Sequence, residues 1–250
     1  MRRLTPAVVF FALAILSQIA LAQESQVSLP PPQPQSGLPH VSVARQFLND
    51  EKAIWTSPLR IRRNQVKWLV PLAAGAAALV ATDWDFSQKI GENSSISRAS
   101  HVVSNLGGGA PMMAASGTML ALGKLTHNDR AVDAGGIALQ AVLHTQLVVT
   151  GIKMATNRER PDKPRGHGSF FAGGRSFPSG HAATTFALAT VLASEYHDKK
   201  WVGIGAYGFA TAVSLSRLGG RKHFPSDVVI GASMGYLISR YVLKHHHPGG

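Results

Sequence analysis

The sequence contains no cysteine among its 250 residues, and it has few acidic side chains. The absence of cysteine excludes disulfide bonds and thiol catalysis. Asp and Glu number 13 against 25 Lys and Arg, which gives a formal net charge of +12 at pH 7. Such an excess suits nucleic acid, an anionic membrane surface or phosphorylated substrates. Because no nucleic-acid-binding motif is present, we expect no nucleic-acid partner and interpret the charge as attraction for other anions.

Apolar segments with helical spacing make up most of the chain after residue 67. Hydrophobic residues are 45% of the sequence and charged residues 15%, which is enough to bury the core of one large domain. No strand-like alternation is present, so we predict an all-α fold, a six-helix antiparallel bundle. Small residues within the segments favour close helix contacts. The predicted helices cover residues 68–82, 101–124, 131–155, 181–196, 201–217 and 226–243.

The N-terminal region predicts export. Residues 1–22 begin with two arginines, continue with an apolar stretch and end in Ala20-Leu21-Ala22, a pattern typical of a cleaved signal peptide. An uncleaved membrane anchor is the alternative. Residues 23–42 are rich in Pro, Gln and Ser and cannot bury enough surface to fold, so we expect a linker.

Residues 43–67 are expected to form an amphipathic lead-in to a catalytic domain at 68–245. Apolar residues recur at helical spacing between charged ones, so this segment can lie along the domain or a membrane surface. Four basic residues between 60 and 67 either bind anionic lipid headgroups or are an ordinary solvated run. Asp83 and Asp85 are expected to mark a helix end.

The segment from Ser216 to Asp227 places many charged and polar side chains between two apolar segments. Burying charge without partners is costly, so this composition indicates a site rather than packing. Pro225 suits the first turn of a helix, in which Asp227 can reach a ring nitrogen of His223 and leave the other nitrogen free to attack. Arg217 adds a planar fork for phosphate oxygens. These residue types together predict phosphoryl transfer.

Two further segments carry anion-binding signals. Lys153 and Arg160 are seven positions apart, which is about two helical turns, so they fall on nearly the same helix face. Ser179 is a natural N-cap, and its amide and those of Gly180 and His181 would lie at the positive end of the following helix. Both segments therefore favour binding of an anion.

All three segments fall at one end of the predicted bundle. In an antiparallel arrangement, the end of 131–155, the start of 181–196, the end of 201–217 and the start of 226–243 share one face. We therefore expect the active site at one end of the bundle. The loop 162–177 would cover the same face as a lid or specificity loop, or simply as a linker.

Three motifs occur in order: Lys153…Arg160-Pro161, Pro178-Ser179-Gly180-His181 and Ser216-Arg217…His223…Asp227. In this order and with these gaps they resemble the signature of the type 2 phosphatidic acid phosphatase superfamily, which also contains bacterial non-specific acid phosphatases and vanadium haloperoxidases. Each motif alone is a weak signal, whereas three complete motifs in order are specific. The resemblance covers residues 68–243.

The resemblance implies a phosphoric ester or pyrophosphate hydrolase that needs no metal and no other cofactor. His223 would be the nucleophile and form a phosphohistidine, with Asp227 orienting it. His181 would protonate the leaving oxygen and then activate water. Fixed cations and amides would do the work that Mg²⁺ does elsewhere. The phosphate-binding set implied by the motifs is Lys153, Arg160, Ser179, Gly180 and Arg217.

The substrate and the location stay open at this point. The implied partner is a phosphorylated lipid or a small phosphoester. Two other classes compete with a phosphatase: a vanadium-dependent haloperoxidase and a non-catalytic anion-binding protein. We expect export from a bacterial cytoplasm and an extracytoplasmic site. Tryptophans at the ends of apolar segments favour membrane association. Two observations favour a soluble periplasmic protein instead. Most of the segments are shorter than the roughly 20 residues that a membrane span needs. If the chain starts outside the cytoplasm and all six segments cross the membrane, the site would lie on the cytoplasmic side.

Overall fold

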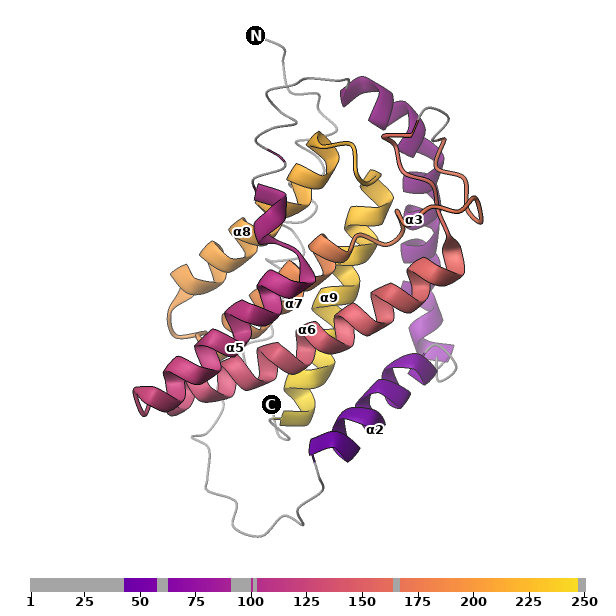
Figure 1. Cartoon of the computed structure of the whole chain (residues 1–250). Coiled ribbons are helices and arrows are strands. Elements are labelled where there is room, and N and C mark those ends of the chain that lie inside the picture. The colour runs from indigo at the N-terminus through magenta and orange to yellow at the C-terminus, as the bar shows by residue number, and fades with distance from the viewer. Residues whose placement is uncertain (1–42, 58–62, 91–99, 101–102, 164–166, 247–250) are drawn as a thin grey trace. The chain divides into compact units, whose positions relative to one another are not determined.

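The computed structural model describes residues 43–57, 63–90, 100, 103–163 and 167–246 (Figure 1). The predicted signal peptide at 1–22 and the linker at 23–42 lie outside the described residues. Every regular element within the described ranges is a helix, and these ranges contain no strand. The all-α prediction is therefore confirmed.

The helices follow the predicted segments in chain order, with one helix before them. The first predicted segment lies inside α3, and the second is interrupted: residues 103–106 are helical, residues 107 and 108 form a turn, and α5 begins at Gly109. The expected helix end at Asp83 and Asp85 is wrong, since α3 continues through both residues. The bounds are α2 Val43–Thr56, α3 Arg63–Ile90, α5 Gly109–Leu125, α6 Asp129–Thr156, α7 Gly180–Glu195, α8 Lys200–Gly219 and α9 Pro225–His246.

Local capping chemistry explains where α6 begins and ends and where α7 begins. The Asn128 side chain accepts a hydrogen bond from the Ala131 amide at 3.1 Å and caps α6. The same helix ends at Asn157, which adopts the left-handed conformation that asparagine tolerates. Ser179 caps α7 as the sequence predicts, with its side chain accepting from the Ala182 amide.

Helix α7 lies at the centre of the helical packing and contacts α5, α6, α8 and α9 (Figure 1). Alanines occupy much of its buried surface, so neighbouring backbones approach closely. On α9, a Cβ at Gly231 would lie 2.4 Å from the Ser179 carbonyl oxygen, and one at Gly235 would lie 2.0 Å from that of Ala183. These glycines bring the start of α9 against the start of α7.

Helix α2, which forms the first part of the predicted lead-in at 43–67, packs against α6 and α9. The Glu51 carboxylate pairs with Nδ1 of the buried His144 at 2.5 Å, and the Phe47 ring stacks on the same imidazole. The Trp55 ring covers Gly151, where a Cβ would lie 2.7 Å from the indole. His144 therefore has the structural role expected of a single histidine on a helix.

Helix α6 is the one described helix that is long and apolar enough to cross a membrane, and half of its most apolar window is buried inside the protein. Core helices of water-soluble proteins have the same length and composition. Large apolar side chains are exposed on several helices, including Leu48, Leu125, Trp201 and Ile204. The fold is thus compatible with both locations considered from the sequence.

Two glycines test the close contact between α7 and α9. Gly235→Ala should lower the free energy of unfolding by about 1–3 kcal/mol, because the new Cβ overlaps the Ala183 carbonyl. Gly208→Ala in α8 is the matched control: no atom lies within 4 Å of its Cβ, so alanine should stabilise the helix by about 0.5–1 kcal/mol. Urea unfolding followed by circular dichroism measures both, and equal changes would contradict the packing.

Candidate active site

A cavity of about 200 Å³ lies where the ends of α6 and α8 meet the starts of α5, α7 and α9. Its wall includes six of the predicted site residues, brought together from positions 153 to 223. Two lining residues, Gly109 and Gln146, belong to none of the three motifs. The lining residues are Gly109, Gln146, Lys153, Arg160, Gly180, His181, Arg217 and His223.

The two predicted residues that do not line the cavity lie beneath it. Ser179 and Asp227 are both fully buried. The Ser179 amide donates to the main-chain oxygen of Asp227 at 2.8 Å, so it is not free for an anion as the sequence suggested. The amides of Gly180 and His181 remain in the first turn of α7, where a helix offers no internal acceptor.

Hydrogen bonds to neighbouring residues hold Lys153 and Arg217 in place. Lys153 Nζ donates to the carbonyl oxygen of Arg175 at 2.9 Å and lies 3.4 Å from that of Ser176. Arg217 closes α8 and donates to the Ser104 hydroxyl. The loop that follows is tied back to it, because the Lys222 and His223 amides donate to the Arg217 carbonyl at 3.0 and 3.3 Å.

These cations repel one another. Burial lowers the pKa of Lys153 to about 8; Asp227 opposes that shift, and Arg160, Arg217 and Arg175 add to it. Burial, followed by the charge of Arg160, lowers the pKa of Arg217 to about 10. Within the described part of the chain, no carboxylate forms an ion pair with Lys153, Arg160 or Arg217. The cavity is therefore built to receive an anion.

His223 and Asp227 form the pair that the sequence predicted. Nδ1 of His223 lies 3.5 Å from Oδ2 of Asp227, longer than a normal hydrogen bond. The same oxygen accepts from the Phe224 amide at 2.9 Å and from the Ser176 hydroxyl. Burial lowers the pKa of His223 to about 4 although Asp227 opposes it. Burial acts to raise the pKa of Asp227, but His223, Arg158 and Ser176 together lower it.

Arg158 is the main residue that the sequence analysis missed. Its side chain is almost wholly buried, and its guanidinium lies between the rings of Phe170 and Phe224, 4.7 and 4.6 Å from their centroids. One terminal nitrogen donates to Asp227 Oδ1 at 2.7 Å, and the other donates to Asp83 Oδ2 at 2.8 Å. Arg158 therefore links the carboxylate beside His223 to helix α3.

Asp83 completes this buried network. It accepts from the Ser226 amide at 3.0 Å and from the Ser226 hydroxyl, which joins α3 to the first turn of α9. Burial raises its pKa, and the contacts with Ser226 and Arg158 oppose that rise. A carboxylate directly after an apolar segment and an extra arginine inside a motif were the available signals, since buried charges need partners.

The start of α5 is the second feature outside the motifs. A Cβ at Gly107 would lie 2.2 Å from the Val213 side chain, and one at Gly109 would lie 2.6 Å from Gln146 Oε1. Gly108 faces His181, whose Nε2 would lie 3.6 Å from an added Cβ. The three glycines thus allow a second helix N-terminus to approach the cavity beside His181.

Substitutions at Arg158 and Arg160 distinguish the role of the buried network from that of the first cavity. Arg158→Met leaves Asp83 and Asp227 buried without their cation, so it should lower the free energy of unfolding by about 3–5 kcal/mol. Arg160→Met is the control, because no described residue pairs with that partly exposed side chain, and stability should change by less than about 0.5 kcal/mol. Urea denaturation decides, and two similarly stable variants would refute the account of Arg158.

Comparison with known proteins finds a family model that matches the part of the chain carrying this geometry. Residues 134–248, which contain all three motifs, match the model of the PAP2 superfamily. Lipid A 1-phosphatase of Porphyromonas gingivalis is 35% identical over 107 residues, covering 42% of this chain and 21% of that protein. Lipid A 4'-phosphatase of Bacteroides thetaiotaomicron is 32% identical over 107 residues, covering 40% and 47%. The chain thus spans less than half the length of either curated relative.

Two solved structures share the fold. The crystal structure of Aquifex aeolicus LpxE superposes with a TM-score of 0.52 and 21% identity, over 65% of this chain and 94% of that one. A transmembrane PAP2 type phosphatidylglycerolphosphate phosphatase from Bacillus subtilis gives a TM-score of 0.50 and 23% identity, over 84% and 96%. At these identities the likeness concerns the fold.

Proposed function

We propose that this protein, whose residues 134–248 match the model of the PAP2 superfamily, is a phosphatase that hydrolyses phosphate monoesters or pyrophosphates of lipids through a phosphohistidine intermediate. One observation carries the proposal: His181 and His223 line the same cavity as three cations that have no carboxylate partner among the described residues. A phosphate group is the anion that such a cavity suits, and two histidines supply a nucleophile and an acid.

The first half of the reaction forms the intermediate. Asp227 lies on the Nδ1 side of His223, so Nε2 attacks phosphorus while the bond between phosphorus and the ester oxygen breaks. His181 gives its proton to the departing oxygen. The lowered pKa of His223 supports this assignment, because a neutral imidazole is the attacking form at neutral pH.

The second half releases phosphate. His181, now neutral, takes a proton from water, and the water oxygen attacks phosphorus as the bond to Nε2 breaks. Lys153, Arg160 and Arg217, with the first-turn amides of α7, hold the equatorial oxygens in both halves. Because these charges are part of the protein, we expect turnover to need no added metal.

Lipid substrates are proposed for two reasons. Both curated relatives are named as lipid A phosphatases. Exposed apolar side chains also lie close to the site in the chain: Met154 follows Lys153 directly and is 54% exposed, and Phe171, in the loop after Arg160, is 80% exposed. A soluble phosphatase of the periplasm is the second candidate, favoured by the half-buried state of α6. Both candidates put the site outside the cytoplasm, in keeping with the predicted signal peptide.

Phosphate release tests the proposed nucleophile. Purified protein should hydrolyse an aryl phosphate in EDTA, and vanadate should inhibit it. His223→Ala should lower kcat about a thousandfold or more, because the attacking group is lost. His197→Ala is the control, since that imidazole is exposed at the far end of α7 and should keep full activity. Turnover that survives in His223→Ala would exclude the phosphohistidine route.

The acid role of His181 predicts proton uptake when an anion binds. In the empty cavity, burial and the charges of Arg217, His223, Lys153 and Arg160 lower the pKa of His181 to about 3, so the ring is neutral at pH 5.5. A bound dianion offsets those cations and raises this pKa. Sulfate, a dianion that does not titrate at this pH, should therefore bind with uptake of up to one proton.

Titration calorimetry in two buffers of different ionisation enthalpy measures that proton. His181→Asn should abolish the uptake, and His223→Asn should retain most of it. Lys153 does not contribute at pH 5.5, because a lysine with a pKa of about 8 is already protonated there. Sulfate binding without proton uptake in the unmodified protein would contradict the acid role.

A further inference from the structure

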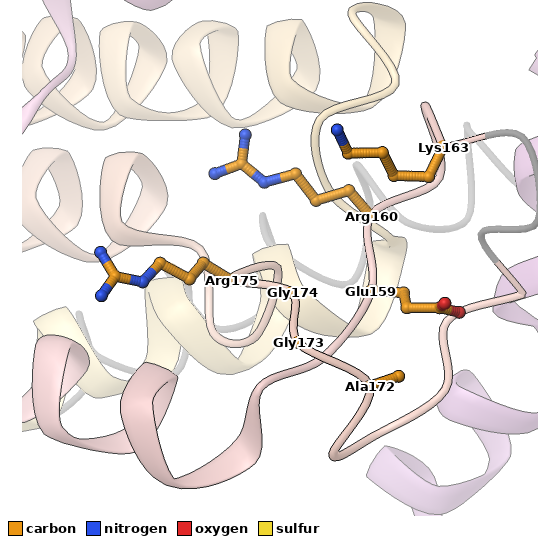
Figure 2. Close-up of a pocket in the computed structure, with 7 residues that line it drawn as sticks. All are labelled: Glu159, Arg160, Lys163, Ala172, Gly173, Gly174 and Arg175. Atoms are coloured by element: carbon orange, nitrogen blue, oxygen red, sulfur yellow. The ribbon is translucent and has the colours of Figure 1, made fainter.

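Figure 2 shows the residues that line a second and larger cavity, of about 710 Å³. Arg160 also lines the first cavity, which contains His181 and His223. The segment after α6 and the loop that was predicted to be a lid or specificity loop form the wall of the second cavity. Because Arg160 lines both cavities, a substrate whose phosphate lies in the first cavity can extend into the second. The residues that line the second cavity are Glu159, Arg160, Lys163, Ala172, Gly173, Gly174 and Arg175.

Positive charge dominates this second cavity. Arg160, Lys163 and Arg175 stand against a single carboxylate, that of Glu159. Figure 2 shows the charged ends of the three cations extending to the same side of the view and the Glu159 carboxylate extending to the opposite side. Among the described residues, no ion pair or side-chain hydrogen bond engages any of these three cations. They are available to a ligand.

The number of cations exceeds what one phosphate dianion needs. Lys153, Arg160 and Arg217 already face the first cavity. Arg175 is near enough to this group to act on the pKa of Lys153. Lys163 and Arg175 add two further positive charges next to an uncompensated cluster, an arrangement that self-repulsion disfavours unless more negative charge binds.

The main chain fixes the wall that carries Arg175. The amides of Ala172 and Gly174 both donate to the Asn157 carbonyl at 3.0 Å, and the Ser176 amide donates to the Arg158 carbonyl at 2.9 Å. A Cβ at Gly174 would lie 2.1 Å from that same Arg158 oxygen, so only glycine permits this close approach. The Arg175 side chain therefore projects from a backbone whose position is already set.

We propose that the cavity of Arg160, Lys163 and Arg175 is a second anion subsite, and that the substrate carries a second phosphate group. The inference rests on the proposed function, since the first phosphate is the one that His223 attacks. The second phosphate is either joined directly to the first, as in a diphosphate ester, or carried at another position of the same molecule, as in a bisphosphate. The second subsite contributes binding and orientation, and the reaction itself is unchanged.

Paired substrates test the subsite. The pairs are geranyl monophosphate with geranyl diphosphate, and a hexose 6-phosphate with the corresponding 1,6-bisphosphate. The preference within a pair is the ratio of kcat/KM values for the two-phosphate and one-phosphate members. Arg175→Ala and Lys163→Ala should each lower this preference about tenfold, whereas Lys124→Ala, an exposed cation at the far end of α5, should keep it. The pair that responds identifies the spacing of the two phosphates, and an unchanged preference in both pairs overturns the proposal.

Binding without turnover separates this inference from the proposed function. Methylenediphosphonate should bind at least ten times more tightly than methylphosphonate by titration calorimetry, and Arg175→Ala should remove the difference. A diphosphonate preference in a protein that releases no phosphate would refute the phosphatase and keep the subsite. Equal binding of the two phosphonates in a protein that does release phosphate would refute the subsite and keep the phosphatase.

Discussion

The buried guanidinium of Arg158 is the contact on which the active end of this fold depends. It joins a carboxylate of α3 to a carboxylate of α9 and is enclosed by two aromatic rings. Its Nε also donates to the Gly168 carbonyl at 3.0 Å, so the loop after α6 shares the same anchor. Removing a charge from water costs several kcal/mol of free energy unless all its hydrogen bonds are formed. Few other side chains could therefore replace Arg158 or its partners. The carboxylate beside His223 is held on one side by this anchor.

Two arginines separated by a single residue therefore serve opposite purposes. Arg158 is buried and fully paired, and carboxylates inside the protein neutralise its charge. Arg160 is partly exposed and faces two cavities without a carboxylate partner among the described residues. The turn after Asn157, which closes α6 in the left-handed conformation, places the side chain of Arg158 in the interior and that of Arg160 at the two cavities. As a result, one arginine is neutralised inside the protein and the other adds positive charge to the cavities.

The sequence predicted the helices and the motifs but not the network beneath them. Apolar periodicity located the segments because each helix buries a face, and the three motifs could be recognised because their residues lie close together in the chain. Asp83 and Arg158 are 75 positions apart, and spacing carries no information about such a pair. The same limit explains why the amide of Ser179 seemed free: its acceptor is the main chain of Asp227, which only the packing of α9 against α7 brings near.

In the loop between Gly168 and Ser176, the main chain and the side chains have different roles. Its carbonyl groups hold Lys153, while the side chain of Arg175 faces outward into the larger cavity. Substitutions at the outward positions can therefore change what the cavity accepts without moving the lysine, because the carbonyl groups stay whichever side chain is attached. Such a loop allows substrate preference to diverge among descendants of one ancestor while the chemistry is inherited intact.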